Sequence, residues 1–283
     1  MSSTRLNELL WLAAACALLL AALGSPQFLP TEAAQDAAWE EFLKSARISA
    51  EEQMGGPDAT TRPWKLSLEK GGRSRLGLWK NVDVVREDLV DTWRYEVAAY
   101  RLDRLLGLDL VPPTVERRVK GEKGSLQLWV DGTATLKKKT GDGTAVPAER
   151  APAWNRLAFL QRAFDSLIGN EDRNANNILV TDDWRMLLID HSRSFRTKKA
   201  FTAQLVFGER GLFRAPDGSP YPIVPLPRGF FEKLKALDEA RVREAVRPYL
   251  TKSEIWAVLL RAGVLVKEIE DVARLRGEAA ALY

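Results

Sequence analysis

The chain has 283 residues, of which 46% are hydrophobic, and a net charge of +4. It can therefore bury a full core in one domain of about 220 residues, and its mild basicity gives no indication of a nucleic-acid partner. The single cysteine, Cys16, lies in an apolar N-terminal run, and the single histidine is His191. For the chain after that run, a structural disulfide, a cysteine metal site and a multi-histidine metal site are therefore excluded.

The first predicted element is the apolar run over residues 9–23, which follows Arg5. As a helix with a rise of about 1.5 Å per residue it spans roughly 22 Å, less than the ~30 Å hydrocarbon core of a bilayer. Ala22 and Gly24 are small residues that suit a signal peptidase. We interpret residues 1–24 as a cleaved signal peptide, with an uncleaved anchor that associates with a membrane through residues 9–23 as the alternative.

The distribution of basic residues around this run indicates the compartment. Arg5 and the terminal amine precede the run, whereas the next base is Lys44. This asymmetry favours export of the C-terminal part. We expect a protein that is exported (periplasmic, lumenal or extracellular) or membrane-anchored. The acidic residues 25–60 are predicted as a helical or linker segment, followed by a domain over residues 61–283.

The first candidate functional residue of that domain lies on a predicted strand. Leu76, Leu78 and Lys80 alternate with Gly77 and Trp79, so on a strand the lysine shares a face with two leucines. A lone lysine on a strand is usually a solvated edge residue. Lys80 gains a functional interpretation only together with residues further along the chain.

A clear helix follows in DTWRYEVAAYRLDRLLG, which Asp91 or Thr92 caps and Gly107 ends. Glu96 flanks its apolar stripe. The residues three and four positions away from it include no base, so an ion-pair partner elsewhere is expected. The alternative is an ordinary solvated glutamate. Further on, residues 124–132 alternate as a strand that leads to a turn, and residues 153–169 show the spacing of a core helix.

The most informative segment is LIGNEDRNANNILVTDDWRMLLIDHSRSF, residues 167–195. Asp172 is followed five positions later by Asn177, then by two short apolar runs around a polar turn, the second ending at Asp190. The turn predicts a β-hairpin that brings Asn177 and Asp190 to the same edge. This order matches the base and metal ligands of phosphoryl transfer by kinases. An Asx-rich surface loop before an ordinary hairpin is the alternative.

The remaining sequence predicts helices over residues 229–237 and 238–247, a helix from the capping box Thr251 to Glu254 up to Gly263, and a last helix at the C-terminus. The second half is therefore mostly helical, whereas the first half mixes strands with one main helix. We predict an α+β, two-lobed protein-kinase-like fold. Its small lobe, residues 61–132, has a β-sheet and one main helix, and its larger, mostly helical lobe covers residues 150–283.

These motifs resemble known atypical kinases. GNEDRNANNIL is similar to the DRHxxN catalytic loop of phosphatidylinositol kinases and HipA-type kinases. IDHSRSF resembles the metal-binding segment of secretory-pathway kinases that phosphorylate proteins and proteoglycan sugars. Two departures stand out, because Asn174 replaces the usual His and Ser192 replaces the Gly two residues after the metal-binding Asp. The resemblance is specific over about thirty residues.

A kinase needs a nucleotide-binding small lobe, and residues suited to it lie upstream. Lys80 is expected to reach the ATP phosphates and Glu96 to position it, while Leu78 covers the adenine. The hinge is expected near residues 128–130, where Val130 offers backbone groups to the adenine. Gly71 and Gly72 would let the backbone approach the phosphates.

In the large lobe, Asp172 is expected to act as base or to orient the acceptor hydroxyl, and Asn177 with Asp190 to hold Mg²⁺ or Mn²⁺. The predicted function is an ATP-dependent phosphotransferase that moves the γ-phosphoryl group to a hydroxyl of a protein, sugar or lipid. A nucleotide-binding pseudokinase or scaffold is the alternative, which Asn174 and Ser192 favour.

Overall fold

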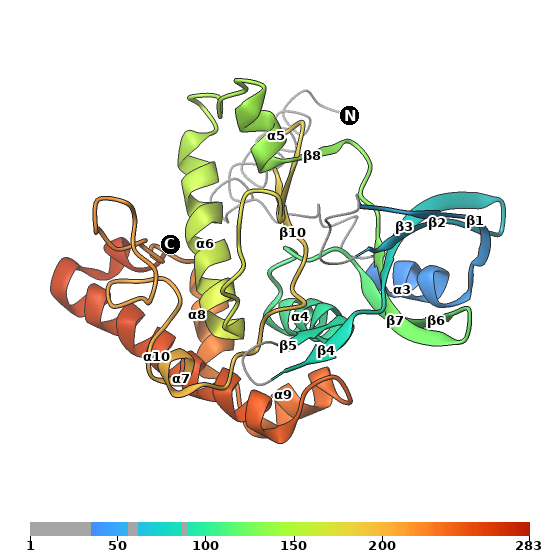
Figure 1. The fold of residues 1–283 in the computed structure, drawn as a ribbon. Helices are drawn as coiled ribbons and strands as arrows, with labels where there is room; N and C mark the ends of the chain where they lie inside the picture. The colour runs from blue at the N-terminus through green and yellow to red at the C-terminus, as the bar shows by residue number, and fades with distance from the viewer. Residues whose placement is uncertain (1–34, 56–61, 87–89) are drawn as a thin grey trace, which may run out of the picture.

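The structure, a computed structural model, describes residues 35–55, 62–86 and 90–283. Their elements form two lobes that lie side by side, a sheet-rich lobe and a mostly helical one (Figure 1). The predicted signal peptide or anchor, residues 1–24, lies outside the described residues. No helix within the described ranges is both long enough and apolar enough to cross a membrane.

The small lobe is built on a five-stranded sheet, which in the described ranges pairs its strands in the order β1-β2-β3-β7-β6, all antiparallel. Helix α3 (Asp36–Ser45) packs against β2, β6 and β7. The strands are β1 (Arg47–Gln53), β2 (Trp64–Lys70), β3 (Arg73–Lys80), β6 (Thr114–Val119) and β7 (Glu122–Leu128).

Alternation along β3 gives the sheet two different faces. Trp79 is buried against α3 in a cluster with Leu68 and Leu126. Gly77 lies on the same face, where a Cβ atom would come within 2.8 Å of the Leu126 side chain. The alternation therefore directs Lys80 to the opposite face, as predicted.

The edge strand β1 was not predicted. It lies within residues 25–60, which we expected to be helical or linker, and it extends the small-lobe sheet by pairing with β2. All but one of its residues are exposed, and it carries no apolar alternation that marks a half-buried strand. Backbone pairing with β2, rather than burial of side chains, accounts for its conformation.

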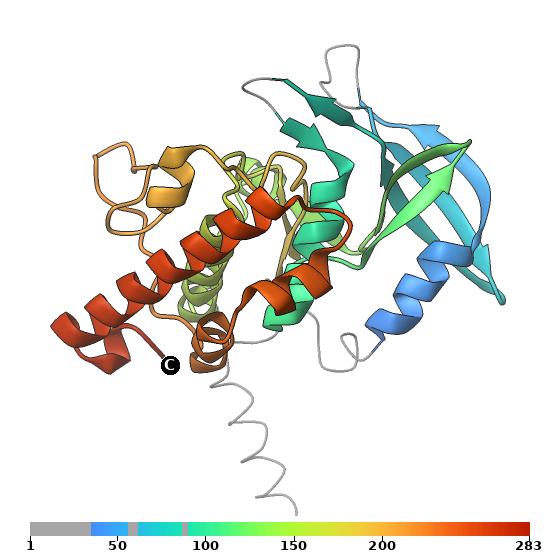
Figure 2. The same cartoon turned by 90° about the horizontal axis from the view of Figure 1, so that it is seen from below.

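Helix α4 (Trp93–Leu106) lies between the two lobes (Figure 2). Thr92 caps its start by accepting a hydrogen bond from the Arg94 backbone, and Gly107 ends it at a φ of 66°. Its buried apolar side chains belong to the hydrophobic core of the large lobe, not to that of the sheet. The strands β4 (Asp83–Val85) and β5 (Val90–Thr92) pair just before it.

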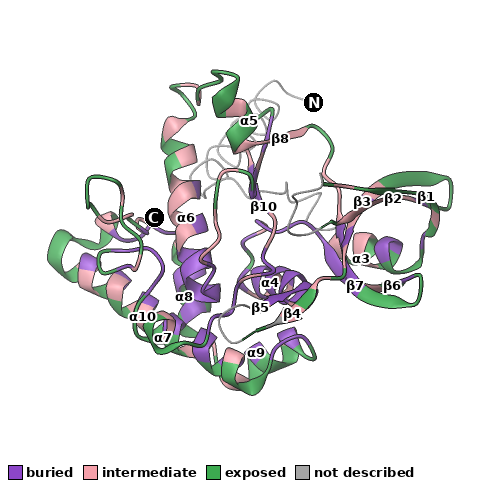
Figure 3. Cartoon of the chain, viewed as in Figure 1, coloured by how far each residue is buried: buried purple, intermediate pink, exposed green. Residues whose placement is uncertain are grey.

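The large lobe combines helices with a small sheet. Strands β8 (Thr133–Thr135), β9 (Ile178–Thr181) and β10 (Met186–Leu188) pair in the order β10-β9-β8. The antiparallel pairing of Met186 with Val180 confirms the predicted hairpin. The helices are α5 (Leu136–Gly141), α6 (Ala151–Ile168), α7 (Lys199–Ala203), α8 (Arg228–Lys235), α9 (Glu239–Val246), α10 (Lys252–Arg276) and the 3-10 helix η1 (Glu278–Ala280). Buried residues concentrate on α4 and α6 (Figure 3).

Helix α10 corrects one prediction. The Thr251 and Glu254 capping box is present, but the helix continues through Gly263 to Arg276, so the predicted last helix is the same helix. Gly263 lies on the exposed side, and a Cβ atom there would meet nothing within 4 Å. A single glycine costs a helix only about 1 kcal/mol, which burial of the opposite face outweighs.

Candidate active site

The centre of the site is an ion pair between the two lobes. The Nζ atom of Lys80, on β3, lies 2.7 Å from Oε1 of Glu96, on α4. Their side chains are only 11% and 3% exposed. The other Glu96 oxygen accepts a hydrogen bond of 2.9 Å from the His191 backbone. The structure therefore supplies the partner that Glu96 lacks on its own helix.

Both members of the pair are held in their charged forms. Burial alone would lower the pKa of Lys80, but the carboxylates of Glu96 and Asp190 raise it above its ordinary value. Burial alone would raise the pKa of Glu96, yet the Lys80 ammonium and the His191 hydrogen bond lower it well below its usual range. The ammonium is thus a fixed positive charge at neutral pH.

Asp190 is the third member of this cluster. Its Oδ1 atom lies 2.8 Å from the Lys80 Nζ atom, and its side chain is 37% exposed. The residue follows β10 and has a φ of 60°, a conformation that Asp adopts more readily than most residues and that turns the chain sharply. Ser192, at the position where many kinases have Gly, donates a hydrogen bond of 3.4 Å to the same Oδ1 atom.

The loop after α6 presents the other two predicted residues. The Asn177 side-chain amide donates to the Asp172 main-chain oxygen at 3.0 Å, and the Asn170 side chain accepts from the Asp172 backbone, also at 3.0 Å. The Asn177 carbonyl accepts from the backbone N–H of Ile189 at 3.2 Å. The hairpin therefore brings Asn177 next to the residue before Asp190, as predicted.

A buried ion pair that we did not predict fixes this loop. The Arg173 guanidinium makes two contacts with Asp165 of α6, at 2.9 and 3.0 Å. It also donates to the carbonyls of Asn177 and Ile189 at 2.6 and 2.7 Å. The side chains of Arg173 and Asp165 are 2% and 0% exposed. One arginine thus ties the loop of Asp172 and Asn177 to the strand that leads to Asp190. Asp165 lies in the last turn of α6, and nothing in the local sequence marked it as the partner of Arg173.

His191 is a buried part of the loop that follows Asp190. Its side chain is fully buried, and its Nδ1 atom is 3.5 Å from a Glu96 oxygen. Burial lowers the pKa of His191, which leaves the imidazole neutral at pH 7. Because it has no access to solvent, it does not suit the role of catalytic base.

Comparisons with solved structures define the fold. The chain superposes on hydra Fam20 solved with a sugar, with a TM-score of 0.60 at 15% identity over 88% of this chain and 92% of the other. For the Golgi casein kinase with Mn and ADP bound, the TM-score is 0.58 at 16% identity over 88% and 78%. For the Helicobacter pylori proinflammatory kinase CtkA, it is 0.51 at 14% identity over 83% and 96%. The chain has an atypical kinase fold. No protein-family model and no curated protein sequence matches it.

The atypical kinase fold confirms the predicted α+β, two-lobed architecture and the resemblance to secretory-pathway kinases. The two departures from the family motifs are accommodated locally. Asn174 donates to the Asp172 main-chain oxygen at 3.2 Å and accepts from the Asn176 backbone at 3.0 Å, which makes it part of the loop turn. The Ser192 carbonyl accepts a 2.9 Å hydrogen bond from the Thr92 backbone, so it anchors the loop after Asp190 to the start of α4.

Of the two residues expected to contact the adenine, one lies beside Lys80 and the other lies in a turn between the lobes. Leu78 lies two residues before Lys80 on the same face of β3. Val130 lies in the connection between the lobes, where its carbonyl accepts a 2.8 Å hydrogen bond from the Thr133 hydroxyl. The structure thus places Leu78 beside Lys80, whereas Val130 belongs to the turn that leads into β8.

Gly71 and Gly72 do not have the role we expected. Both have positive φ angles and form the tight turn between β2 and β3, where Lys70 pairs with Arg73. This turn lies at the opposite end of β3 from Lys80, about 23 Å away at ~3.3 Å per residue. It therefore cannot approach phosphates bound at Lys80. At the Lys80 end of the sheet the described pairs are Gln53 with Trp64 and Trp64 with Trp79.

The side-chain oxygens of Asn177 and Asp190 suit a divalent metal whose other ligands are phosphate oxygens and water. Asn177 directs its amide nitrogen to Asp172, which leaves its side-chain oxygen as an acceptor, and Asp190 offers a half-exposed carboxylate. Among the described residues no group of three His, Cys, Asp or Glu side chains gathers into a metal site. Mg²⁺ commonly binds one or two side-chain oxygens plus phosphates and water, which is the arrangement available here.

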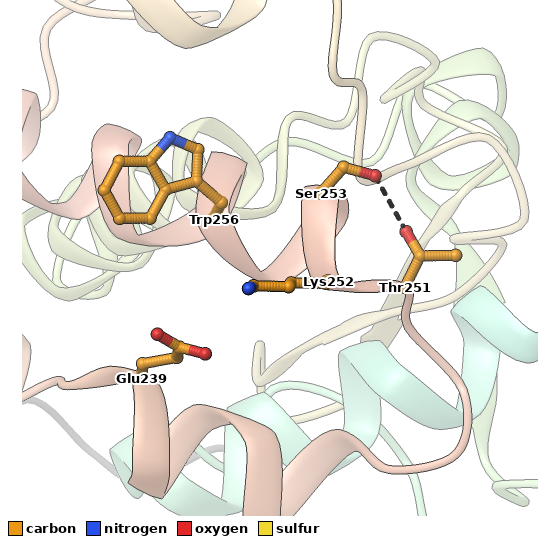
Figure 4. A pocket seen from close by; sticks show the side chains of 5 residues that line it. All are labelled: Glu239, Thr251, Lys252, Ser253 and Trp256. Carbon is orange, nitrogen blue, oxygen red and sulfur yellow. Dashed lines mark hydrogen bonds between the residues drawn. The ribbon is translucent and has the colours of Figure 1, made fainter.

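A separate pocket on the large lobe lies between the starts of α9 and α10 (Figure 4). Its lining includes the exposed indole of Trp256 and the side chains of Lys252 and Glu239. None of the predicted site residues lines it. We therefore assign the candidate active site to the contacts between the lobes and not to this pocket.

Proposed function

We propose that the chain is an ATP-dependent phosphotransferase that moves the γ-phosphoryl group to a hydroxyl of a protein, sugar or lipid acceptor. The observation that carries this proposal is the Lys80 ammonium, held at 2.7 Å from Glu96 and 2.8 Å from Asp190 across the two lobes. Kinases use this arrangement to bind the nucleotide phosphates. The Mn and ADP in the Golgi casein kinase structure support the same pair of ligands here.

Each residue has a distinct task in the reaction. Lys80 neutralises charge on the phosphates, and Glu96 keeps its ammonium in place. Asp172 accepts the proton of the acceptor hydroxyl as the hydroxyl oxygen bonds to the γ-phosphorus and the bond from that phosphorus to the bridging oxygen of ADP breaks. Asn177 and Asp190 would hold Mg²⁺ or Mn²⁺, which supplies neutralisation of the phosphate charge when bound.

Two measurements test the proposal. Thermal stabilisation by ATP with and without Mg²⁺ or Mn²⁺ separates nucleotide binding from its metal-dependent part. Transfer of labelled γ-phosphate to protein, sugar and lipid acceptors then identifies the reaction. A wild-type protein that binds ATP and metal, phosphorylates none of these acceptors and behaves like Asp172→Asn would instead be a nucleotide-binding pseudokinase or scaffold.

We also propose that the protein is exported or membrane-anchored. The apolar run over residues 9–23 and the small residues Ala22 and Gly24 support this localisation. Mass spectrometry of the natively produced protein should find a new N-terminus near Ser25. An intact terminus at Met1 or Ser2 in a membrane fraction would establish the anchor.

A further inference from the structure

The guanidinium of Arg193 lies between two carboxylates at the junction of the lobes. Its Nε atom donates to Oδ2 of Asp91 at 3.0 Å, and its Nη1 atom is 3.7 Å from Oδ2 of Asp172. The Arg193 side chain is 30% exposed, whereas that of Asp91 is 4% exposed. One end of the contact is therefore buried and the other reaches the residue that we propose as the base.

The Asp172 carboxylate is less constrained than its backbone. The backbone N–H and C=O of Asp172 are bonded to the side chains of Asn170 and Asn177. The carboxylate itself is 42% exposed, and among the described residues it makes an ion-pair contact with Arg193. Without that contact no ion pair among the described residues would hold the carboxylate, because the two backbone hydrogen bonds do not involve its oxygens.

The ion pair with Asp91 attaches Arg193 to the start of α4. It lies on β5, directly before Thr92, the residue that caps α4. The Thr92 backbone donates to the Ser192 carbonyl at 2.9 Å, so the segment that carries Arg193 is attached to the start of α4 twice. Burial of the Asp91 carboxylate favours retention of this ion pair, since a buried charge without a partner is costly.

We propose that Arg193 is a positioning residue that fixes the Asp172 carboxylate and, through Asp91, ties it to the start of α4. This inference rests on the proposed function. It means that the helix carrying Glu96 controls both ends of the reaction: it holds Lys80 at the phosphates and, through Asp91 and Arg193, the base at the acceptor hydroxyl. A displacement of a reacting group by about 1 Å costs roughly 10²-fold in rate, so loss of this tether should affect turnover.

The test compares turnover with nucleotide binding. Replacement of Arg193 alone leaves Asp91 buried and unpaired, so the main variant is the neutral pair Asp91→Asn with Arg193→Gln. It should lower kcat by about 10- to 100-fold and leave KM for ATP and metal-dependent ATP binding within about twofold of wild type. Arg193→Lys should recover part of kcat. In an Asp172→Asn background, the neutral pair should cause no further loss, because the carboxylate to be positioned is already absent.

Arg94→Gln is the matched control, because Arg94 also makes an ion pair at the start of α4, at 2.6 Å from Asp83. It should retain wild-type kcat. A neutral pair with wild-type kcat, or losses that multiply with Asp172→Asn, would overturn the positioning role while the proposed function stands. A purely structural role would instead weaken ATP binding in parallel with kcat, and that result would also reject the inference. If wild type transfers no phosphate to any acceptor, the proposed function fails first and the inference falls with it.

Discussion

Replacement of Lys80 by Met is the most direct perturbation of the site, and it acts on stability and binding together. The Glu96 side chain is 3% exposed and would lose its charged partner, keeping the His191 backbone donor and the Nδ1 atom of His191 at 3.5 Å. A buried charge that loses its partner destabilises a protein by about 3–5 kcal/mol. For a domain of this size 1 kcal/mol corresponds to about 2–4 °C in Tm, so Lys80→Met should lower Tm by about 6–20 °C.

The functional consequence is measured as the shift in Tm that ATP and Mg²⁺ cause. At an ATP concentration of 100 times Kd, wild type should gain about 2.7 kcal/mol, or about 5–11 °C. Lys80→Met should lose most of this gain, because it lacks the ammonium that we propose to bind the phosphates. Differential scanning fluorimetry on the two proteins measures both effects.

The double variant Lys80→Met with Glu96→Gln separates stability from binding. It removes both buried charges, and the amide oxygen still accepts from the His191 backbone, so Tm should recover toward wild type. The ATP-dependent shift should remain absent. If Lys80→Met or the double variant keeps a wild-type ATP shift, then the assignment of Lys80 to the phosphates is wrong.

Further variants test single contacts. Asp190→Asn should abolish the metal-dependent part of ATP binding by calorimetry, whereas Asp172→Asn should keep it and lower transfer by about 10²-fold or more; equal effects would contradict these roles. Arg173→Met removes the charged partner of the buried Asp165 carboxylate and should reduce the free energy of unfolding in urea by about 3–5 kcal/mol. A reduction below about 1 kcal/mol would contradict the stabilising role of this ion pair. Burial raises the pKa of Asp103 to about 7 despite Arg104 at 3.0 Å. The folded state therefore holds a proton that the unfolded state releases near pH 4, and stability should fall as pH rises from about 4 to 7. Over that range the free energy of unfolding of Asp103→Asn should rise relative to that of wild type by up to about 4 kcal/mol. A difference between the two proteins that does not change with pH would refute this.

The parts of the site that the sequence could predict are those with local signals. The hairpin follows from two apolar runs around Thr181, Asp182 and Asp183, and its register brings Asn177 beside the residue before Asp190. The contact between Lys80 and Glu96 could also be predicted. The alternation on β3 showed which face carries Lys80, and the cap at Thr92 showed where the helix of Glu96 begins.

The remaining parts depend on contacts that leave no local pattern. Arg173 lies in a loop and its partner Asp165 in a helix. The local sequence of neither residue indicates that its side chain is buried, because the burial depends on their contact in the folded chain. β1 is a strand only because an edge of β2 is available to it. Gly71 and Gly72 suit a phosphate loop and a tight turn equally well, since both need positive φ, and only the strand register decides between them.

The division of hydrophobic contacts around α4 has a mechanical consequence. The helix packs into the core of the large lobe, whereas β3 packs into the separate core of the sheet. Glu96 therefore lies on a helix that shares its apolar core with the strand before Asp190, whereas Lys80 lies on a strand of the other core, and α4 also contacts β6 and β7 of the sheet. A hinge motion of the sheet would withdraw the ammonium from both carboxylates at once, without unfolding a turn of α4. Separation of the two cores and loss of the charge that we propose to bind phosphates would then be a single event, and a ligand that holds that ammonium in place would keep the two cores together.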